Sequence, residues 1–209
     1  MGINLQKGQR IDLTKGRTGL SKLIIGLGWD PVKQGGGKSG GGILSGLFGG
    51  GRASNTPNID CDASALMLDS NGKLTGKEDV IFFQNLKSRC GSVMHSGDNL
   101  TGDGDGDDEQ IVVDLSKIPA KYEKIVFLVN IYDCKNRNQH FGMIQNAFIR
   151  AVDASNGTEL LKYNLSDNYS GKTCLFAGEI YRRDGEWKFA ALGEATEDPG
   201  IGSVRQRYI

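Results

Sequence analysis

The sequence lacks any long apolar stretch, which limits where the protein can work. No apolar run approaches the roughly 20 residues that span a bilayer. The N-terminal residues have no apolar signal core, and Gln6 stands where an N-myristoylation motif requires Ser or Thr. We therefore expect a cytoplasmic protein without a transmembrane segment.

The chain also lacks an excess of charge of either sign. Its 25 Lys and Arg residues balance 25 Asp and Glu residues over a length of 209. Binding of nucleic acid, or of an anionic membrane surface, draws on excess positive charge. Zero net charge argues against either as the main role, and we expect no nucleic-acid partner.

Cysteine and histidine are scarce, which disfavours several kinds of site. The two histidines, His95 and His140, accompany no recognisable Ser or Cys nucleophile motif, and we expect both to be surface or capping residues. The cysteines form no CxxC pair, so we expect neither a zinc site nor a disulfide framework but free, mostly buried thiols. They are Cys61, Cys90, Cys134 and Cys174.

Glycine, by contrast, is abundant and unevenly distributed. Ten of the seventeen residues from 35 to 51 are glycine. That composition predicts a flexible loop, and the residue spacing of a phosphate-binding P-loop is absent from it. We therefore expect a Gly-rich insertion at about 31–57.

Most of the remaining chain alternates apolar and polar residues, which is typical of β-strands. The alternation is clear at 23–29, whereas 124–132 is apolar on both faces and predicts a central strand. A short helix is expected at 141–147. The many short strands with turn signals between them predict an all-β fold, an antiparallel β-sandwich with few short helices. We expect one domain over 1–195, followed by a C-terminal tail at 196–209.

Negative charge is concentrated in one Gly-rich segment, residues 96–109. No Lys or Arg lies between Arg89 and Lys117 to neutralise it locally. Two carboxylates about 5 Å apart repel by roughly 3 kcal/mol at an effective dielectric constant of about 20, so a bound cation would stabilise the segment. Hard oxygen ligands on a flexible loop favour calcium, and a solvated acidic turn without a ligand is the alternative. The acids are Asp98, Asp103, Asp105, Asp107, Asp108 and Glu109, joined by the amide of Asn99.

A second pair of acids opens a predicted strand. Asp60 and Asp62 are two residues apart, so they point to the same side of a strand, about 7 Å from each other. Together with the acidic segment they would supply enough carboxylates for two neighbouring calcium ions. The segment is not an EF-hand, because Asp108 stands where that loop needs Gly and a strand pattern follows. Only His95 and Cys61 could add softer ligands, which disfavours zinc or copper.

A catalytic use of the acidic segment is a competing interpretation. Paired carboxylates can act as acid and base, but one of them then needs a raised pKa in an apolar pocket. A segment dense in glycine and charge is the opposite environment, so we expect no enzymatic activity. A metal-assisted hydrolase, in which a bound ion activates water, is the alternative.

Several motifs of the chain are distinctive when taken together. They are INLQKGQRIDL near the N-terminus, GLGWD, the D-x-D-x-S-A pattern that begins at Asp60, SGDNLTGDGDGDDE from Ser96, IVFLVNIYDC, NAFIRAVD, YNLSDNYS and FAGEIYRRDGEWKF. In these motifs the chain resembles the TerD family of tellurium-resistance and stress-response proteins. The resemblance covers nearly the whole chain except residues 31–57 and the last dozen residues.

The resemblance implies a calcium-binding β-sandwich with no established enzymatic activity. It implies a bacterial cytoplasmic protein that resists tellurite, DNA damage or phage, with other Ter proteins as partners at the inner face of the membrane. Tellurite held by the cysteines is a further alternative, which their dispersal along the chain disfavours. The metal ligands carried over by motif are Asp60, Asp62, Asp98, Asn99, Asp103, Asp105, Asp107, Asp108 and Glu109.

Overall fold

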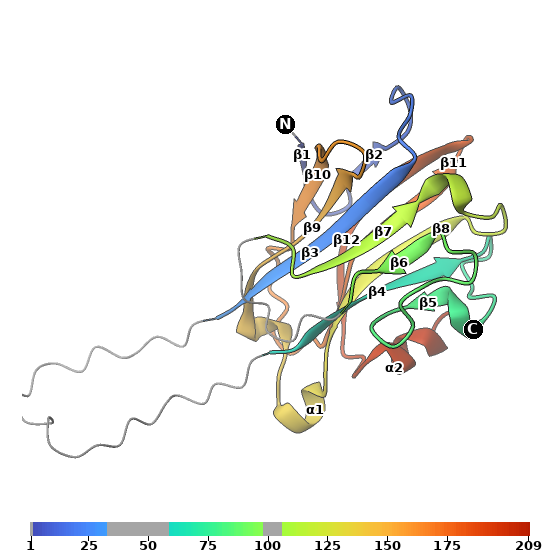
Figure 1. The fold of residues 1–209 in the computed structure, drawn as a ribbon. Coiled ribbons are helices and arrows are strands. Elements are labelled where there is room, and N and C mark those ends of the chain that lie inside the picture. Colours follow the sequence, from blue (N-terminus) through green and yellow to red (C-terminus); the bar gives the residue numbers. More distant parts are fainter. Residues whose placement is uncertain (1, 33–58, 98–105) are drawn as a thin grey trace, which may run out of the picture.

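Two six-stranded sheets pack face to face in the computed structural model, which describes residues 2–32, 59–97 and 106–209 (Figure 1). Sheet A consists, in spatial order, of β1 (Ile3–Leu5), β10 (Glu159–Asn164), β9 (Ile144–Asp153), β3 (Lys22–Pro31), β7 (Glu109–Asp114) and β6 (Val93–His95). Sheet B consists of β2 (Arg10–Asp12), β12 (Glu186–Thr196), β11 (Cys174–Arg183), β8 (Lys124–Ile131), β4 (Cys61–Leu68) and β5 (Val80–Ile81). Apart from the parallel pair β1–β10, these neighbours are antiparallel, which confirms the predicted sandwich.

Helical structure in the described residues is short, as expected. The α-helices are α1 (Cys134–Arg137) and α2 (Ile201–Gln206), and the 3-10 turns are η1 (Lys77–Asp79), η2 (Leu115–Lys117) and η3 (Phe141–Met143). Part of the predicted insertion, residues 33–57, lies outside the described residues. No helix within 2–32, 59–97 and 106–209 is long and apolar enough to cross a membrane.

The predicted helix at 141–147 is wrong beyond Met143, because β9 begins at Ile144. Asn146 adopts a left-handed backbone with φ of 56°, and the pairing of β9 with β3 shifts register between Gly28 and Asp30. An irregularity of this kind interrupts the two-residue alternation of a strand. That irregularity explains why the sequence pattern did not predict this part of the strand.

The main core lies between the sheets and follows the predicted alternation. From β3, Leu23, Ile25, Leu27 and Trp29 all enter this core. Strand β8 lies between β11 and β4, and its residues Phe127 and Val129 also enter it. The central position expected for 124–132 is thereby confirmed.

A second, smaller core covers the outer face of sheet B and explains why β8 is apolar on both faces. Val126 and Leu128 of β8 point into it. Helix α2 covers this face (Figure 1), and its Val204 is fully buried. Asp198, just after β12, pairs with Arg207, just after α2, at 2.7 Å. The C-terminal residues thus pack on the sandwich.

Val204→Ala is expected to lower the free energy of unfolding by about 2 kcal/mol, because it removes two buried methyl groups and leaves a small void. Urea denaturation monitored by tryptophan fluorescence measures the change. Gln206→Ala is the matched control, since Gln206 is an exposed residue of the same helix. A Val204→Ala protein as stable as the Gln206→Ala control would show that α2 does not contribute to the fold.

Candidate functional site

Two acid-bearing segments meet at one end of the sandwich. Strand β4 of sheet B and strand β7 of sheet A both begin there, after Asp60 and Asp108 respectively. The Glu109 side chain is buried and its Oε2 accepts a 2.6 Å hydrogen bond from the Ala63 backbone N–H. Glu109 therefore links the two sheets across this end, which brings together the two segments that the sequence predicted to meet.

His95 lies beside this link and is not the surface residue that the sequence predicted. Its side chain is fully buried, with Nε2 3.3 Å from Glu109 Oε2 and 3.1 Å from the Ala63 carbonyl oxygen. The Gly97 N–H donates to Nδ1 at 3.0 Å, so in a neutral ring the proton is on Nε2. The alternation of β6 carried this signal, because Val93, two residues earlier, is also buried. His140 does act as a cap, accepting from the Gly142 N–H at 3.0 Å.

The side chains of three consecutive acids, Asp107, Asp108 and Glu109, point in three different directions just before and at the start of β7. Asp107 Oδ1 and Oδ2 accept hydrogen bonds from Arg150 Nε at 2.7 Å and Nη2 at 3.0 Å. Asp108 Oδ2 accepts from the Trp29 N–H at 2.7 Å. Glu109 points between the sheets, as its bond to Ala63 requires. One ion cannot reach all three carboxylates in this conformation.

Arg150 corrects the expectation that nothing neutralises the acidic segment. No base lies near Asp107 in sequence, but β9 pairs with β3 so that Arg150 is opposite Gly26. The guanidinium therefore reaches Asp107 from a strand far along the chain. Sequence neighbours alone could not reveal this ion pair, because sheet pairing supplies the partner.

The remaining carboxylates all lie near enough to one buried thiol to raise its pKa. Burial raises the pKa of the Cys61 thiol well above its usual value, and the negative charges of Asp62, Asp60, Glu109 and Asp108 raise it further. Both acid-bearing segments thus act on a single side chain at the start of β4. Repulsion among these acids is what a bound cation would relieve.

The pKa of Asp108 shows that negative charges are also crowded at this end of sheet A. Burial raises the pKa of its carboxyl group, the hydrogen bond from the Trp29 N–H opposes this, and the charges of Asp30, Glu109 and Asp107 add to the rise. Asp30 ends the GLGWD motif and was missed as a site residue. Its Oδ2 accepts from Asn146 Nδ2 at 2.8 Å.

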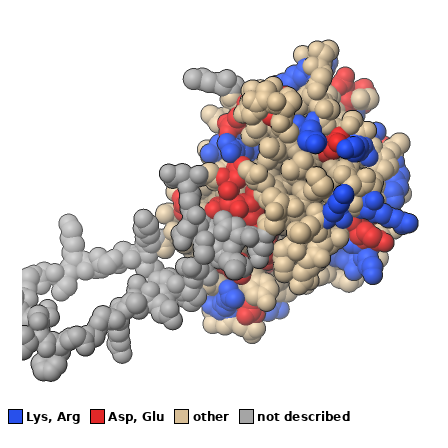
Figure 2. Space-filling view, viewed as in Figure 1, with Lys and Arg blue, Asp and Glu red and all other residues tan. Residues whose placement is uncertain are grey.

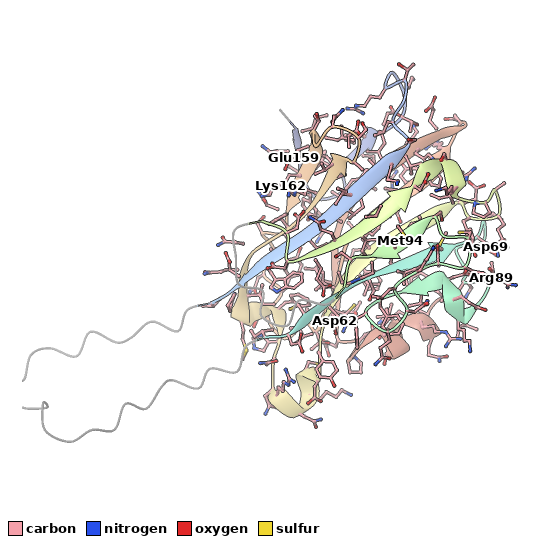
Figure 3. All side chains as sticks on the ribbon, in the orientation of Figure 1. Asp62, Asp69, Arg89, Met94, Glu159 and Lys162 are labelled. Carbon is pink, nitrogen blue, oxygen red and sulfur yellow. The ribbon has the colours of Figure 1, made fainter. Side chains whose placement is uncertain are left out.

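The two acids of the other segment flank Cys61. Asp62 is buried near the start of β4 (Figure 3), with Oδ2 3.4 Å from Asn130 Nδ2, and it lines a cavity of about 300 Å³. Asp60 Oδ2 is 3.9 Å from a guanidinium nitrogen of Arg137, at the edge of ion-pair distance. Asp62 therefore lies on the outer face of sheet B, beside Ile201 of α2, whereas Glu109 points between the sheets at the same end of the sandwich.

The described residues contain only part of the predicted ligand set. Within 2–32, 59–97 and 106–209, no group of three or more His, Cys, Asp or Glu side chains could hold a metal ion by itself. Acidic atoms gather in Figure 2 over the region where Figure 1 places β3 and β7. The donors present are carboxylates, which fits calcium better than softer metals. The other predicted ligands, Asp98, Asn99, Asp103 and Asp105, lie outside the described residues.

Comparison with known proteins identifies close relatives over the whole chain. Residues 1–208 match the family model of the TerD domain. The stress response protein SCP2 of Bacillus subtilis is 63% identical over 209 residues, covering 100% of both chains. The tellurium resistance protein TerD of Serratia marcescens is 40% identical over 208 residues, covering 100% of this chain and 97% of its own.

The fold also recurs in a solved structure. A crystal structure of a homologue of the telluride resistance protein TerD, from Streptomyces coelicolor, matches with a TM-score of 0.63 at 20% identity. The match covers 86% of this chain and 92% of the other. The same two-sheet fold therefore occurs in a distant sequence.

Proposed function

This chain belongs to the TerD family of tellurium-resistance and stress-response proteins, and we propose that it is a calcium-binding module that recruits protein partners when loaded. The single observation that supports this most is the convergence of two acid-bearing segments at one end of the sandwich. Glu109 of sheet A bonds to Ala63 of sheet B, and the charges of Glu109, Asp108, Asp60 and Asp62 all raise the pKa of the Cys61 thiol.

Four of the five described acids of the predicted ligand set have a place in the proposed site, and the fifth, Asp107, is bound by Arg150. Asp60 and Asp62 are presented by sheet B, while Asp108 and Glu109 come from the strand pair β3–β7 of sheet A. Bound calcium would add positive charge among these crowded carboxylates. The backbone N–H groups of Trp29 and Ala63 hold Asp108 and Glu109 in place without the ion, so part of the site is formed in advance.

The interaction role follows from where this site lies. An ion shared by carboxylates of both sheets would fix the surface at the end of the sandwich, and a fixed surface binds a partner at a lower entropic cost. We place the partners among other Ter and stress-response proteins at the inner face of the membrane, and the protein itself in the cytoplasm. A pull-down with calcium and with chelator distinguishes metal-dependent partners from the rest.

A binding role is favoured over a catalytic one, and over capture of tellurite by the thiols of Cys61 and Cys174. Burial raises the pKa of the Cys61 thiol and raises that of Cys174 to about 12, so both remain protonated and poorly reactive at neutral pH. A metal-assisted hydrolase would instead turn over phosphate esters in the presence of calcium, magnesium or manganese. A screen with those three ions tests that alternative.

Calcium is expected to raise the melting temperature of the chelator-treated protein by about 5–10 °C. A ligand at a hundredfold excess over its Kd adds roughly 2.7 kcal/mol to stability, and a domain of this size gains about 2–4 °C for each kcal/mol. Thermal scans by circular dichroism in excess calcium and in EDTA measure the shift, with magnesium as the ionic control.

Two variants show whether the shift depends on the proposed ligands. Asp60→Ala should abolish it, whereas Asp69→Asn should keep it, because Asp69 caps a turn by accepting from the Asn71 and Lys73 N–H groups. Asp69 lies in the turn after β4, away from Asp62 in Figure 3. Equal melting temperatures in calcium and in EDTA would refute the proposed calcium site.

A further inference from the structure

We propose that Asp107 acts as a latch rather than as a calcium ligand: its ion pair with Arg150 fastens the end of the acidic segment to the outer face of sheet A and so positions Asp108 and Glu109. The proposal rests on the calcium site described above, and it removes Asp107 from the ligand set that the sequence predicted. It assigns a positioning role to three residues, Gly26, Asp107 and Arg150, which the motif resemblance does not.

The first support is that both Asp107 oxygens are already engaged. The Arg150 guanidinium binds them in a bidentate manner at 2.7 and 3.0 Å, and Gln110 Nε2 donates to Oδ2 at 2.9 Å. Only 1% of the Asp107 side chain is exposed. A calcium ion at this carboxylate would have to lie beside the positive guanidinium or displace it, and planar bidentate pairs of this kind are among the strongest side-chain contacts.

The second support is the surface on which the latch rests. Gly26 and Gly28 lie on the outer face of β3, where a Cβ atom would normally project. A Cβ at Gly26 would overlap the Asp107 carboxyl group, and one at Gly28 would overlap the Phe148 ring and lie 2.7 Å from the Gly106 carbonyl oxygen. The two glycines therefore allow residues 106–107 to lie directly on the sheet.

The third support is what the latch does to the next two residues. The Asp108 N–H donates to the Leu27 carbonyl oxygen at 2.9 Å, and Glu109 is opposite Leu27 in the β3–β7 register. Successive residues of a strand face opposite sides, so a slip by one residue would turn Glu109 away from the space between the sheets. With Asp107 pinned above Gly26, that register is fixed before any ion binds.

Arg150 is itself held in position from its other side. Its Nη1 lies 3.3 Å from Glu159 Oε2, on the neighbouring strand β10. The chain thus offers a matched control, because Glu159→Gln removes a carboxylate from the same guanidinium without touching the acidic segment. Figure 3 shows Glu159 on β10, away from Asp62.

A double-mutant cycle tests the latch. Asp107→Asn, Arg150→Gln and the combined variant are compared with the unmodified protein by isothermal titration with calcium, and by melting in EDTA. Each single change should weaken calcium binding by about tenfold without changing the number of ions bound, which is a typical size for indirect coupling between sites. The combined variant should bind no more weakly than Arg150→Gln alone, because residues that act as one unit are not additive. Glu159→Gln should change the Kd by less than about twofold.

Three results would overturn the latch. The first is that Asp107→Asn removes a bound ion. The second is that it weakens binding by the same factor in the Arg150→Gln background as in the unmodified protein. The third is that neither single change alters the Kd. Gly26→Ala, which shifts Asp107 without removing a charge, should weaken binding as Asp107→Asn does, and the cycle decides the matter if that variant does not fold.

Failure of the calcium proposal itself would look different. In that case the unmodified protein shows no heat of calcium binding, and the positioning role falls with it. The ion pair is then judged by the melting temperatures in EDTA alone. If Asp107→Asn and Arg150→Gln each lower the melting temperature and the combined variant lowers it no further, the contact between Asp107 and Arg150 has a structural role only.

Discussion

Phe127→Ala is expected to lower the free energy of unfolding by about 4 kcal/mol. Phe127 is fully buried in the middle of β8 and packs into the core between the two sheets. Truncation removes the burial of a whole ring and leaves a cavity that neighbouring strands cannot close, and such changes typically cost about 3–5 kcal/mol. Equilibrium urea denaturation, with circular dichroism in the β-sheet band as the probe, measures the change.

Leu86→Ala is the control for this prediction. The Leu86 side chain is 46% exposed, and its loss should change the free energy of unfolding by less than about 1 kcal/mol. Its carbonyl oxygen still accepts from the His95 N–H, since only the side chain is altered. A Phe127→Ala protein that lost less than about 2 kcal/mol would mean that the space between the sheets is not close-packed.

The position of β8 shows why much of the fold could be predicted from the sequence. A strand that is apolar on both faces needs cover on both sides, and here the second cover is the smaller core beneath α2. The alternation in β3 likewise predicted which residues point inward, because the period of a strand is a local property. Pairing order is not local, and the sequence patterns did not supply it.

The sequence of helix α2 contains a weak pattern of apolar residues that is typical of a helix. Ile201, Val204 and Tyr208 are spaced as i, i+3 and i+7, and all three belong to the smaller core. That spacing is typical of one face of a helix. A six-residue helix is too short to stand out from sequence alone, since most of its stability comes from packing against the sheet.

The candidate site was predictable only where its chemistry is local. The runs of acids identified Asp60, Asp62, Asp108 and Glu109, because acids that are close together in the sequence can be recognised without a structure. Arg150 was not visible, because its partnership with Asp107 depends on the β3–β9 register. Asp30 was missed for the same reason, whereas the burial of His95 was signalled by the alternation of β6, in which Val93 is also buried.

Glu109→Gln is expected to weaken calcium binding by about a hundredfold while leaving the calcium-free protein at least as stable as before. The amide keeps the shape of the side chain and an acceptor for the Ala63 N–H, whose bond to Oε2 is 2.6 Å. It removes the charge, and the charge count of the ligands sets the affinity of calcium sites. Because burial disfavours an ionised carboxylate and the amide oxygen can still accept from the Ala63 N–H, the neutral replacement should not lower the melting temperature in EDTA.

Two measurements distinguish a role of Glu109 as a calcium ligand from a purely structural role in joining the two sheets. Isothermal titration gives the calcium Kd, and thermal scans in EDTA give the stability of the calcium-free protein. Glu179→Gln is the matched control, because Glu179 is also mostly buried but pairs with Lys124 at 2.8 Å on the outer face of sheet B, so its loss should leave the Kd within about twofold. If Glu109→Gln bound calcium as tightly as the unmodified protein, Glu109 would serve only to join β7 to β4. The ion would then have to be held by other residues.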